Sequence, residues 1–305
     1  MAVLGSYQDR FLTLYNDNLL MELQQTNSRL MNIFRREVAK GQKNYIDKLG
    51  ITPTQTKVSR LQKIVWEEEN FERRLITFQM KFSPHCVDIS DLLDMVSDPT
   101  SKILQSMAYS LGRDMDTIIM NAIGGNAVVQ ANGSVTNTAL PSGQKIAVND
   151  ITYDPDLSAA NYPLTFGKLL KAKKLLDQAY NPGEYVVIAP AGQLAYLLTS
   201  TRVASADYRT TKPLESPGTD MGLEGLFGMH FVMYEETGVN GSSDELVYVV
   251  GRNAVECLER VPLTTKIETL PDVVGHPQGM HSYFDMGATR MFEESVVQIA
   301  CSPRK

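Results

Sequence analysis

The sequence has few cysteines and no long apolar run. Its three cysteines lie far apart, so their spacing indicates neither a disulfide framework nor a paired metal-binding motif, and a reducing compartment fits best. No stretch approaches the roughly 18 consecutive apolar residues that a membrane-spanning helix needs, and the opening residues, MAVLGSYQDRF, lack the regions of an export signal. We therefore expect a soluble protein that carries no export signal and has no membrane partner.

The common cofactor and catalytic motifs are also missing. There is no GxxxxGK[ST] phosphate loop, no strand-linked GxGxxG, no GxSxG elbow and no HExxH, so no cofactor is expected. His276 and His281 stand five residues apart, which is not the i, i+4 spacing that places two imidazoles on one helix face. We expect structural histidines; a metal-dependent enzyme that uses His276 and His281 with a cysteine stays as the remote alternative. Asp114 and Asp116 lie two apart on a predicted helix and are expected to be solvated charges.

Acidic residues outnumber basic ones, 35 against 29, and the net charge is −6 with a pI near 5.3. Tight binding to phosphate backbones depends on clustered Lys and Arg, so this balance argues against a protein that grips nucleic acid directly. The 305 residues, 43% hydrophobic and 21% charged, predict a folded chain with one large or two modest domains.

Apolar residues recur at helical spacing near the start of the chain. They lie mostly three or four positions apart, or twice that, at Phe11, Tyr15, Leu19, Leu23, Leu30, Phe34 and Val38. This pattern predicts an amphipathic helix over residues 11–38, or two helices broken near Asn16–Asn18. The helix either faces the core of its own subunit or forms an arm that lies on a neighbouring subunit.

The stretch Lys57–Phe82 predicts a long hairpin. Two runs of β-forming residues flank an acidic tip, Glu67–Asn70. Both arms mix basic and apolar side chains, among them Trp66, Phe71, Arg73 and Arg74. The hairpin is either the edge of a sheet with one wet face, or a protruding ribbon that needs a second chain to cover it, since an isolated two-stranded ribbon is marginally stable.

A long helix is predicted over Pro99–Ile123. Asp98 suits the N-cap, Pro99 suits the first turn, and the pair Gly124–Gly125 ends the helix. Gly112 in its middle indicates a bend or close packing.

The second half of the chain predicts a mixed structure of helices and strands. Residues 126–163 are rich in small polar residues and predict a surface excursion at a domain boundary. The elements expected after it are helices at Phe166–Tyr180 and Gly192–Thr199, strands at Tyr185–Ala189, Met229–Tyr234 and Leu246–Val250, and a long loop at Ala204–Gly222. Alternating runs at Thr264–Glu268 and Ser295–Ala300 predict antiparallel strands of a different sheet.

The closing segment carries a family resemblance. HPQGMHSYFDMGATRMFEESVVQIAC resembles the end of the major capsid proteins of tailed bacteriophages, in which a His-Pro turn leads into a strand, a Gly-Ala-Thr-Arg-Met step and a final Val-Val-x-Ile-Ala-Cys strand. The order of the predicted elements is similar too, from about residue 55 to the end. The resemblance implies an α+β chain with the Hong Kong 97-type capsid fold.

That fold implies a division of the chain into five parts. They are an N-terminal arm at 1–53, an extended E-loop hairpin at 54–82, a peripheral domain at 83–164 with the spine helix 99–123, an axial α/β domain at 165–262, and returning peripheral strands at 263–305. No motif selects a lysine for a covalent cross-link between subunits, so none is predicted.

The resemblance implies a structural function without enzymatic activity. The chain would be a major capsid protein that self-assembles, as pentamers and hexamers, into the icosahedral shell around a double-stranded DNA genome, assembled in the host cytoplasm and found in the virion. Implied partners are other copies of the chain, a separate scaffolding protein, a portal, a possible decoration protein, and DNA that is enclosed but not read. An encapsulin-like compartment for protein cargo is the alternative. The residues expected at contacts between subunits are Phe11, Tyr15, Leu19, Leu23, Trp66, Phe71, Arg73 and Arg74.

Overall fold

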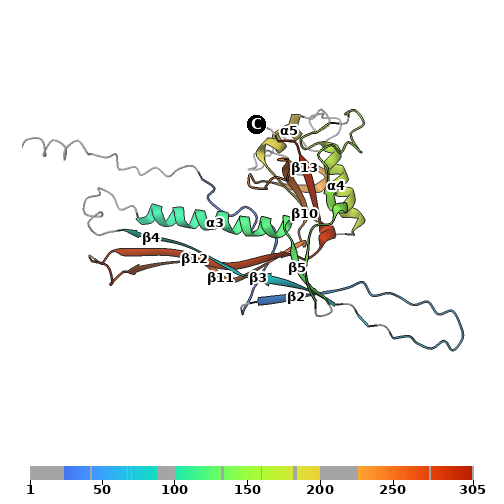
Figure 1. The fold of residues 1–305 in the computed structure, drawn as a ribbon, viewed down its shortest axis with the longest axis horizontal. Coiled ribbons are helices and arrows are strands. Elements are labelled where there is room, and N and C mark those ends of the chain that lie inside the picture. Colours follow the sequence, from blue (N-terminus) through green and yellow to red (C-terminus); the bar gives the residue numbers. More distant parts are fainter. Residues whose placement is uncertain are drawn as a thin grey trace, which may run out of the picture. The chain divides into compact units, whose positions relative to one another are not determined.

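A computed structural model describes residues 24–303, apart from 42, 67, 70, 88–99, 132–133, 159, 181–183, 200–225 and 275. The fold is mixed α+β, as predicted (Figure 1). Two compact units are present: one comprises the segment up to Ser28, Gln79–Met115 and Val261–Met286, and the other comprises Arg29–Phe78, Asp116–Arg260 and the segment from Gly287 onward. No helix in the described ranges is long and apolar enough to cross a membrane.

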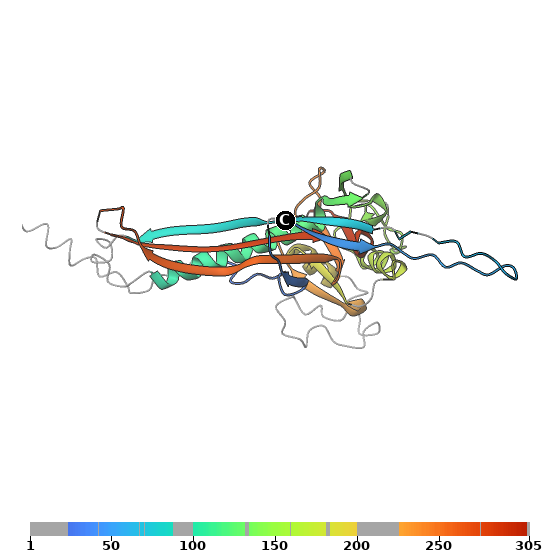
Figure 2. The ribbon, with the colours of Figure 1, turned by 90° about the horizontal axis from the view of Figure 1, so that it is seen from below.

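The first unit is built on long antiparallel strands. Strand β4 (Gln79–Val87) pairs with β12 (Gln278–Arg290), in a register that runs from Gln79 opposite Met286 to Val87 opposite Gln278 (Figure 2). The sheet that contains these strands has the order β1-β11-β12-β4. Of its strands, β1 (Arg35–Val38) and the Val255–Arg260 part of β11 (Val255–Thr269) belong to the second unit. Val87 at the end of β4, Met280 of β12 and Met107 of helix α3 (Thr100–Gly124) form a buried apolar cluster.

Helix α3 confirms the predicted long helix, although Asp98 and Pro99, its expected first residues, lie outside the described residues. A Cβ atom at Gly112 would lie 3.3 Å from the backbone nitrogen of Ser28. Glycine is therefore present for close packing of another chain segment on the helix, which was one of the two predicted reasons.

Asp116 on this helix is not a solvated charge, and that prediction is wrong. Its side chain is fully buried and accepts hydrogen bonds from the backbone N–H groups of Arg29 (3.0 Å) and Leu30 (3.1 Å). The two N–H donors come from a segment 86 and 87 residues away in the sequence, so no local pattern indicates the partner.

The segment 24–38 corrects the prediction of an N-terminal helix. Residues 27–34 form bends and turns, and Arg35–Val38 form strand β1, which pairs in parallel with Glu256–Glu259 of β11. Leu30 and Phe34 are buried as predicted for inward positions, but they are buried by turns rather than by a helix face. A hydrogen-bonded partner far along the chain overrides the local helical period here. The rest of the predicted helix, with Phe11, Tyr15, Leu19 and Leu23, lies outside the described residues.

The second unit contains a five-stranded sheet of order β7-β13-β10-β8-β9. Its strands are β7 (Lys145–Ile146), β13 (Val296–Cys301), β10 (Glu245–Gly251), β8 (Tyr185–Ala189) and β9 (Met229–Met233), and its helices are α4 (Phe166–Gln178) and α5 (Ala191–Thr199). Thr165 caps α4 by accepting a hydrogen bond from the backbone N–H of Lys168. The predicted helices and strands of this region are confirmed, while the predicted loop Ala204–Gly222 lies outside the described residues.

The last strand joins this same sheet, which corrects the prediction that the chain ends in a different one. Strand β13 lies between β10 and β7, and Val296, Val297 and Ile299 are fully buried. Strands β11 and β12 belong to the sheet β1-β11-β12-β4, and the chain then returns to the five-stranded sheet as β13. The alternation is present in the structure, since Gln298 and Ala300 are partly exposed while Val297, Ile299 and Cys301 are buried. Alternation does not indicate which sheet a strand joins, because the partner strands lie far along the chain.

A third sheet has the order β2-β3-β5-β6. Its strands are β2 (Lys43–Leu49), β3 (Phe71–Thr77), β5 (Ala127–Ala131) and β6 (Ser134–Thr138). The predicted surface excursion at 126–163 thus begins with a hairpin of β5 and β6, in which β5 pairs with β3 and so adds both strands to the sheet. Strand β6 is exposed along most of its length, and its small polar residues carry no apolar alternation that would have indicated a strand.

Four buried groups make stability sensitive to alkaline pH. Burial raises the pKa of Tyr185, Tyr234, Cys257 and Cys301 to about 12, and a hydrogen bond to Asp177 adds to the shift at Tyr185. The folded state holds these protons at a pH where the unfolded chain has released them, so the free energy of unfolding should fall as pH rises from about 9 to 12. Burial raises the pKa of Tyr248 in the same direction. Burial lowers the pKa of Lys168 and of Arg290, so these two groups act in the opposite direction, two against five.

Urea unfolding at pH 8, 9, 10 and 11 measures this effect. We expect the midpoint to decrease steadily above pH 9, and Tyr185→Phe to reduce the slope above pH 10. A midpoint that stays level up to pH 11 would contradict the assignment.

Candidate interaction surface

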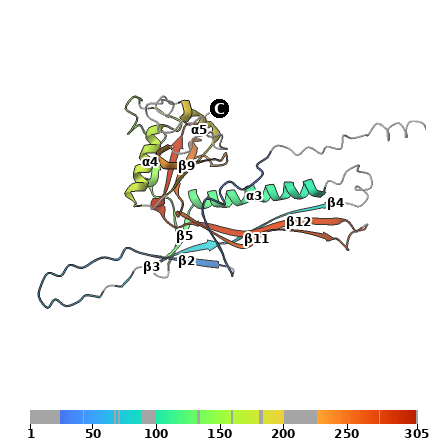
Figure 3. The same cartoon turned by 180° about the vertical axis from the view of Figure 1, so that it is seen from behind.

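The loop of residues 50–70 joins β2 to β3 and extends beyond the paired strands (Figures 1 and 3). The two strands are antiparallel, from Lys43 opposite Thr77 to Leu49 opposite Phe71. A hairpin is therefore present, but its first strand is β2; the prediction of a strand at Lys57–Trp66 is wrong. Residues 57–66 are apolar enough for a strand, yet among the described residues no strand pairs with them.

Large apolar side chains of this loop are exposed to solvent. The exposed fractions are 100% for Ile51, 87% for Val58, 90% for Leu61, 72% for Ile64, 63% for Val65 and 87% for Trp66. The two branches of the loop contact each other through Thr52 with Glu69 (3.2 Å) and through the amide of Gln55, which donates to the carbonyl of Val65 (3.0 Å). Six large apolar side chains exposed on one loop are unusual for a soluble monomer, so the loop is suited to a partner molecule.

The strands β2 and β3 with the loop 50–70 are called the ribbon below. The four ribbon residues predicted at subunit contacts differ in their exposure to solvent. Trp66 is exposed, and Phe71, at the start of β3, is 61% exposed. Arg73 is half exposed and pairs with Asp47 of β2 at 2.8 Å. Arg74 points to the other face of the strand and is 1% exposed. Three of these residues are therefore available to a partner, whereas Arg74 is occupied within its own chain.

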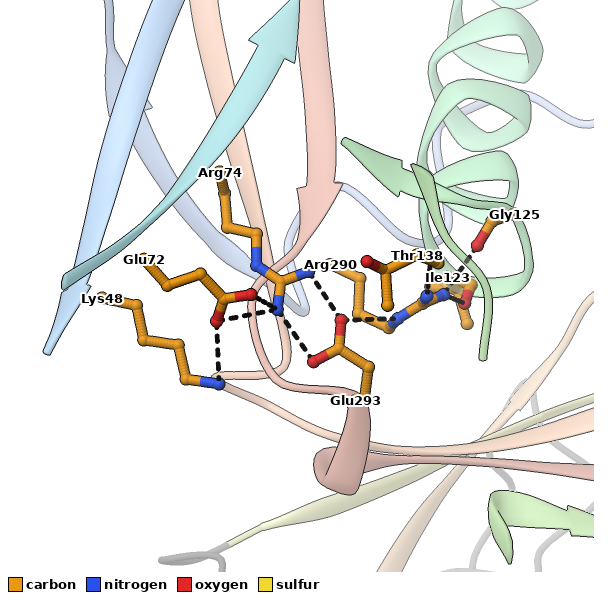
Figure 4. A network of polar contacts seen from close by, with 8 residues as sticks. All are labelled: Lys48, Glu72, Arg74, Ile123, Gly125, Thr138, Arg290 and Glu293. Atoms are coloured by element: carbon orange, nitrogen blue, oxygen red, sulfur yellow. Dashed lines mark hydrogen bonds and ion pairs between the residues drawn. The ribbon is translucent and has the colours of Figure 1, made fainter. Parts of the chain in front are cut away.

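A network of charged side chains holds the base of the ribbon (Figure 4). Arg74 donates two hydrogen bonds to Glu293, Nη1 to Oε1 at 2.6 Å and Nη2 to Oε2 at 2.9 Å. Glu72 lies 3.3 Å from Nη2 of Arg74 and 3.8 Å from the ammonium of Lys48 on β2. Bidentate pairs of this kind fix both the distance and the plane of the two groups. Sequence analysis missed Glu293 and Lys48, because Arg74 and Glu293 are 219 residues apart.

Arg290 extends this network to the end of helix α3. Its side chain is fully buried, and it donates to the carbonyls of Ile123 (2.9 Å), Gly125 (2.8 Å) and Thr138 (3.1 Å). Its Nε lies 3.9 Å from Glu293. A guanidinium that satisfies carbonyls at a helix C-terminus also interacts favourably with the negative end of the helix dipole. Arg290 belongs to the Gly-Ala-Thr-Arg-Met step quoted above and was not itself singled out.

The two histidines of the remote alternative, His276 and His281, lie in different elements of the structure. His276 lies in a turn with a backbone φ of 49°, and its backbone N–H donates a hydrogen bond to the carbonyl of Val273. His281 lies on β12 opposite Pro84, and its ring stacks on Tyr283 at 5.8 Å between centroids. Within the described ranges, no group of three or more His, Cys, Asp or Glu side chains is placed to hold a metal ion. Burial raises the pKa of the Cys257 and Cys301 thiols to about 12, which makes both poor nucleophiles and poor ligands.

Comparisons with known proteins agree with this architecture. The capsid structure of Cyanophage P-SCSP1u superposes with a TM-score of 0.69 at 14% identity, covering 97% of this chain and 94% of that chain. A structure of Mycobacterium phage Che8 gives 0.67 at 17% identity, with 94% and 95% covered, and the capsid of Ralstonia phage GP4 gives 0.69 at 12% identity, with 95% of each covered. No curated protein sequence matches the chain.

A family model described as "Phage capsid protein" matches residues 8–303. The structural similarities, at these low identities, support the fold, and the family match supports the role. Because that match spans nearly all of the sequence, the chain belongs to the phage capsid protein family and is a component of the virion shell.

Proposed function

We propose that this major capsid protein builds an icosahedral shell of pentamers and hexamers around double-stranded DNA by placing its loop 50–70 on neighbouring copies. The observation that carries the proposal is the exposed apolar surface of that loop. Each copy would bury side chains that its own fold leaves in water, and burial of one such side chain stabilises a contact by about 1.5–3 kcal/mol. Many modest contacts of this kind, repeated around a closed shell, make disassembly slow.

The charge of the chain supports a role in enclosing DNA rather than gripping it. A net charge of −6 gives weak repulsion toward packaged DNA, so the inner wall would not condense the genome. A scaffolding protein, a portal and a decoration protein are further proposed partners. Catalysis forms no part of the proposed function.

The division into domains is likewise a proposal. Helix α3 would be the spine, the five-stranded sheet with α4 and α5 the axial domain, and the loop 50–70 with β2 and β3 the E-loop. This last assignment places the start of the E-loop ribbon earlier than residue 54. Residues 1–23, with Phe11, Tyr15, Leu19 and Leu23, would belong to an arm on a neighbouring subunit.

The double variant Val65→Ser/Trp66→Ser tests the proposed contact. Both side chains are exposed, so the melting temperature of the subunit should change little. Particle yield should fall at least about tenfold, because a buried aromatic anchor is worth about 2 kcal/mol or more at an interface. Sedimentation and electron microscopy of the expressed protein, with scaffold supplied if required, measure the yield.

Val135→Ser is the matched control, since Val135 is 61% exposed and lies on β6 rather than in the loop. The control should assemble as the unaltered chain does. Normal particle yield from the double variant would refute the loop as the assembly contact.

A further inference from the structure

We propose that Glu293 is a positioning residue that sets the direction of the β2–β3 ribbon relative to the C-terminal end of helix α3, and thereby the angle at which copies of the chain join. The role of Glu293 in setting the direction of the β2–β3 ribbon concerns the subunit alone. Its effect on the angle between copies rests on the proposed function of the loop 50–70 as an assembly contact.

Glu293 is the single carboxylate that two buried guanidinium groups share (Figure 4). Its Oε1 and Oε2 accept hydrogen bonds from Nη1 and Nη2 of Arg74, at 2.6 and 2.9 Å. The Nε atom of Arg290 lies 3.9 Å from Oε1 of Glu293. Arg74 is 1% exposed, Arg290 is fully buried, and the side chain of Glu293 is 13% exposed. Little water is available to replace these contacts, so the geometry of the carboxylate determines where Arg74 lies.

Arg290 ties Glu293 to the C-terminal end of helix α3. Arg290 donates to three backbone carbonyls, two of which, those of Ile123 and Gly125, lie at the end of α3. Backbone carbonyls at a helix terminus move with the helix. Glu293 itself lies in the short turn η4 (Glu293–Ser295) immediately before strand β13. The carboxylate is therefore positioned by elements of the protein core.

Arg74 ties Glu293 to the base of the loop. Arg74 lies in the middle of β3, and Glu72, two residues nearer the loop, continues the network to Lys48 on β2. Within the described ranges, strand β3 pairs with β2 along its length and with β5 through Arg73, Arg74 and Leu75. The bidentate pair thus holds the ribbon at the point where its sheet contact is short.

A small change at this base is amplified at the loop. A fully extended branch of ten residues would span about 33 Å at roughly 3.3 Å per residue. A rotation of about 10° at its base would move a tip at that distance by about 6 Å. Repeated contacts close into a shell only when the angle between copies is correct, so this displacement would alter or prevent closure.

Arg74→Lys separates positioning from charge. Lysine keeps the positive charge near Glu293 but cannot form the bidentate pair. In the purified subunit, we expect amide hydrogen exchange in β2 and β3 to become about tenfold faster, with no change in α4 or β8. Glu293→Gln, which keeps the size of the side chain and removes the charge, should give the same pattern. It serves as the second variant if Arg74→Lys does not fold.

Arg252→Lys is the matched control, because Arg252 forms an ion pair with Glu184 at 2.6 Å on an exposed part of the same unit. It should leave exchange in β2 and β3 unchanged. Unchanged exchange in Arg74→Lys, or equal acceleration in α4 and β8, would overturn the positioning role, because the latter pattern shows only a general loss of stability.

Electron microscopy of assembled particles tests the effect on the angle between copies. We expect Arg74→Lys to give a broader distribution of diameters or open shells, whereas Arg252→Lys gives particles like those of the unaltered chain. Uniform normal particles from a subunit with a loosened ribbon would overturn the link to assembly angle. If the unaltered chain forms no particles either, the proposed function fails, while the exchange result still decides the positioning role.

Discussion

Replacing Arg290 by Met is expected to lower the free energy of unfolding by about 3–5 kcal/mol, the range for removing one partner of a buried charged network. The substitution leaves the carbonyls of Ile123, Gly125 and Thr138 without their donor in a buried place. It also removes one of the two guanidinium groups near Glu293. Methionine fills much of the volume, so the loss is polar and not a cavity effect. Urea denaturation of the purified subunit measures the change.

Arg252→Met provides the comparison for this substitution. The side chain of Arg252 is 57% exposed and its partner Glu184 is 71% exposed, so its loss should cost less than about 1 kcal/mol. Equal effects of the two substitutions would show that burial of Arg290 does not matter. Arg290→Lys should be intermediate, because one ammonium retains the charge but cannot reach three carbonyls with the geometry of the guanidinium fork.

Gly287→Ala is expected to be the second large effect. An added Cβ would lie 2.6 Å from the carbonyl oxygen of Thr77 and 2.7 Å from Cγ2 of Ile76, which is itself fully buried. The nearest atom is backbone, so it cannot rotate away, and the two segments must separate. Overpacking of this kind costs about 1–3 kcal/mol and more where the backbone has to shift.

The matched control is Gly143→Ala, because nothing lies within 4 Å of a Cβ atom at Gly143. Thermal unfolding should show a drop of several degrees for Gly287→Ala and almost none for Gly143→Ala. If Gly287→Ala unfolds at the temperature of the unaltered chain, the close approach of these segments is not a feature of the folded protein. The expected loss also explains why a glycine precedes Ala-Thr-Arg in the closing segment.

The elements that sequence analysis predicted correctly are those with local signals. Helix α3 has a continuous apolar stripe and a glycine pair at its end, and helix α4 has apolar residues at helical spacing, of which Leu169 and Leu176 are buried. Strand β8 is an uninterrupted apolar run that is buried throughout. Each of these patterns depends on residues within one or two turns of each other, so no knowledge of the rest of the fold was needed.

The wrong predictions share a dependence on partners far along the chain. Residues 35–38 fit a helix by spacing but form a strand because Glu256–Glu259 pair with them. Lys57–Trp66 fit a strand by composition but pair with no strand in the part of the chain that the structure describes. Asp116 looked like a surface charge because the two N–H groups that it binds belong to a distant segment. In each example the deciding interaction lies outside any sequence window.

Some residues of the candidate interaction surface could be predicted from the sequence, and others only from the folded structure. Trp66 and Phe71 are recognisable in the sequence as large apolar residues on either side of the acidic tip, and both are exposed. Arg73 and Arg74 look equivalent in the sequence. Only the direction of each side chain from β3 distinguishes the exposed partner of Asp47 from the buried partner of Glu293.

The sequence by itself determined the α+β class, the long helix, the order of the later strands and the capsid resemblance, because local periodicity and a distinctive closing segment carry that information. Tertiary structure alone decided which strands share a sheet, where β13 returns, and which charges are buried. Hydrogen bonds between strands and ion pairs such as Arg74 with Glu293 join residues hundreds of positions apart, and their stability comes from burial that exists only after the chain has folded.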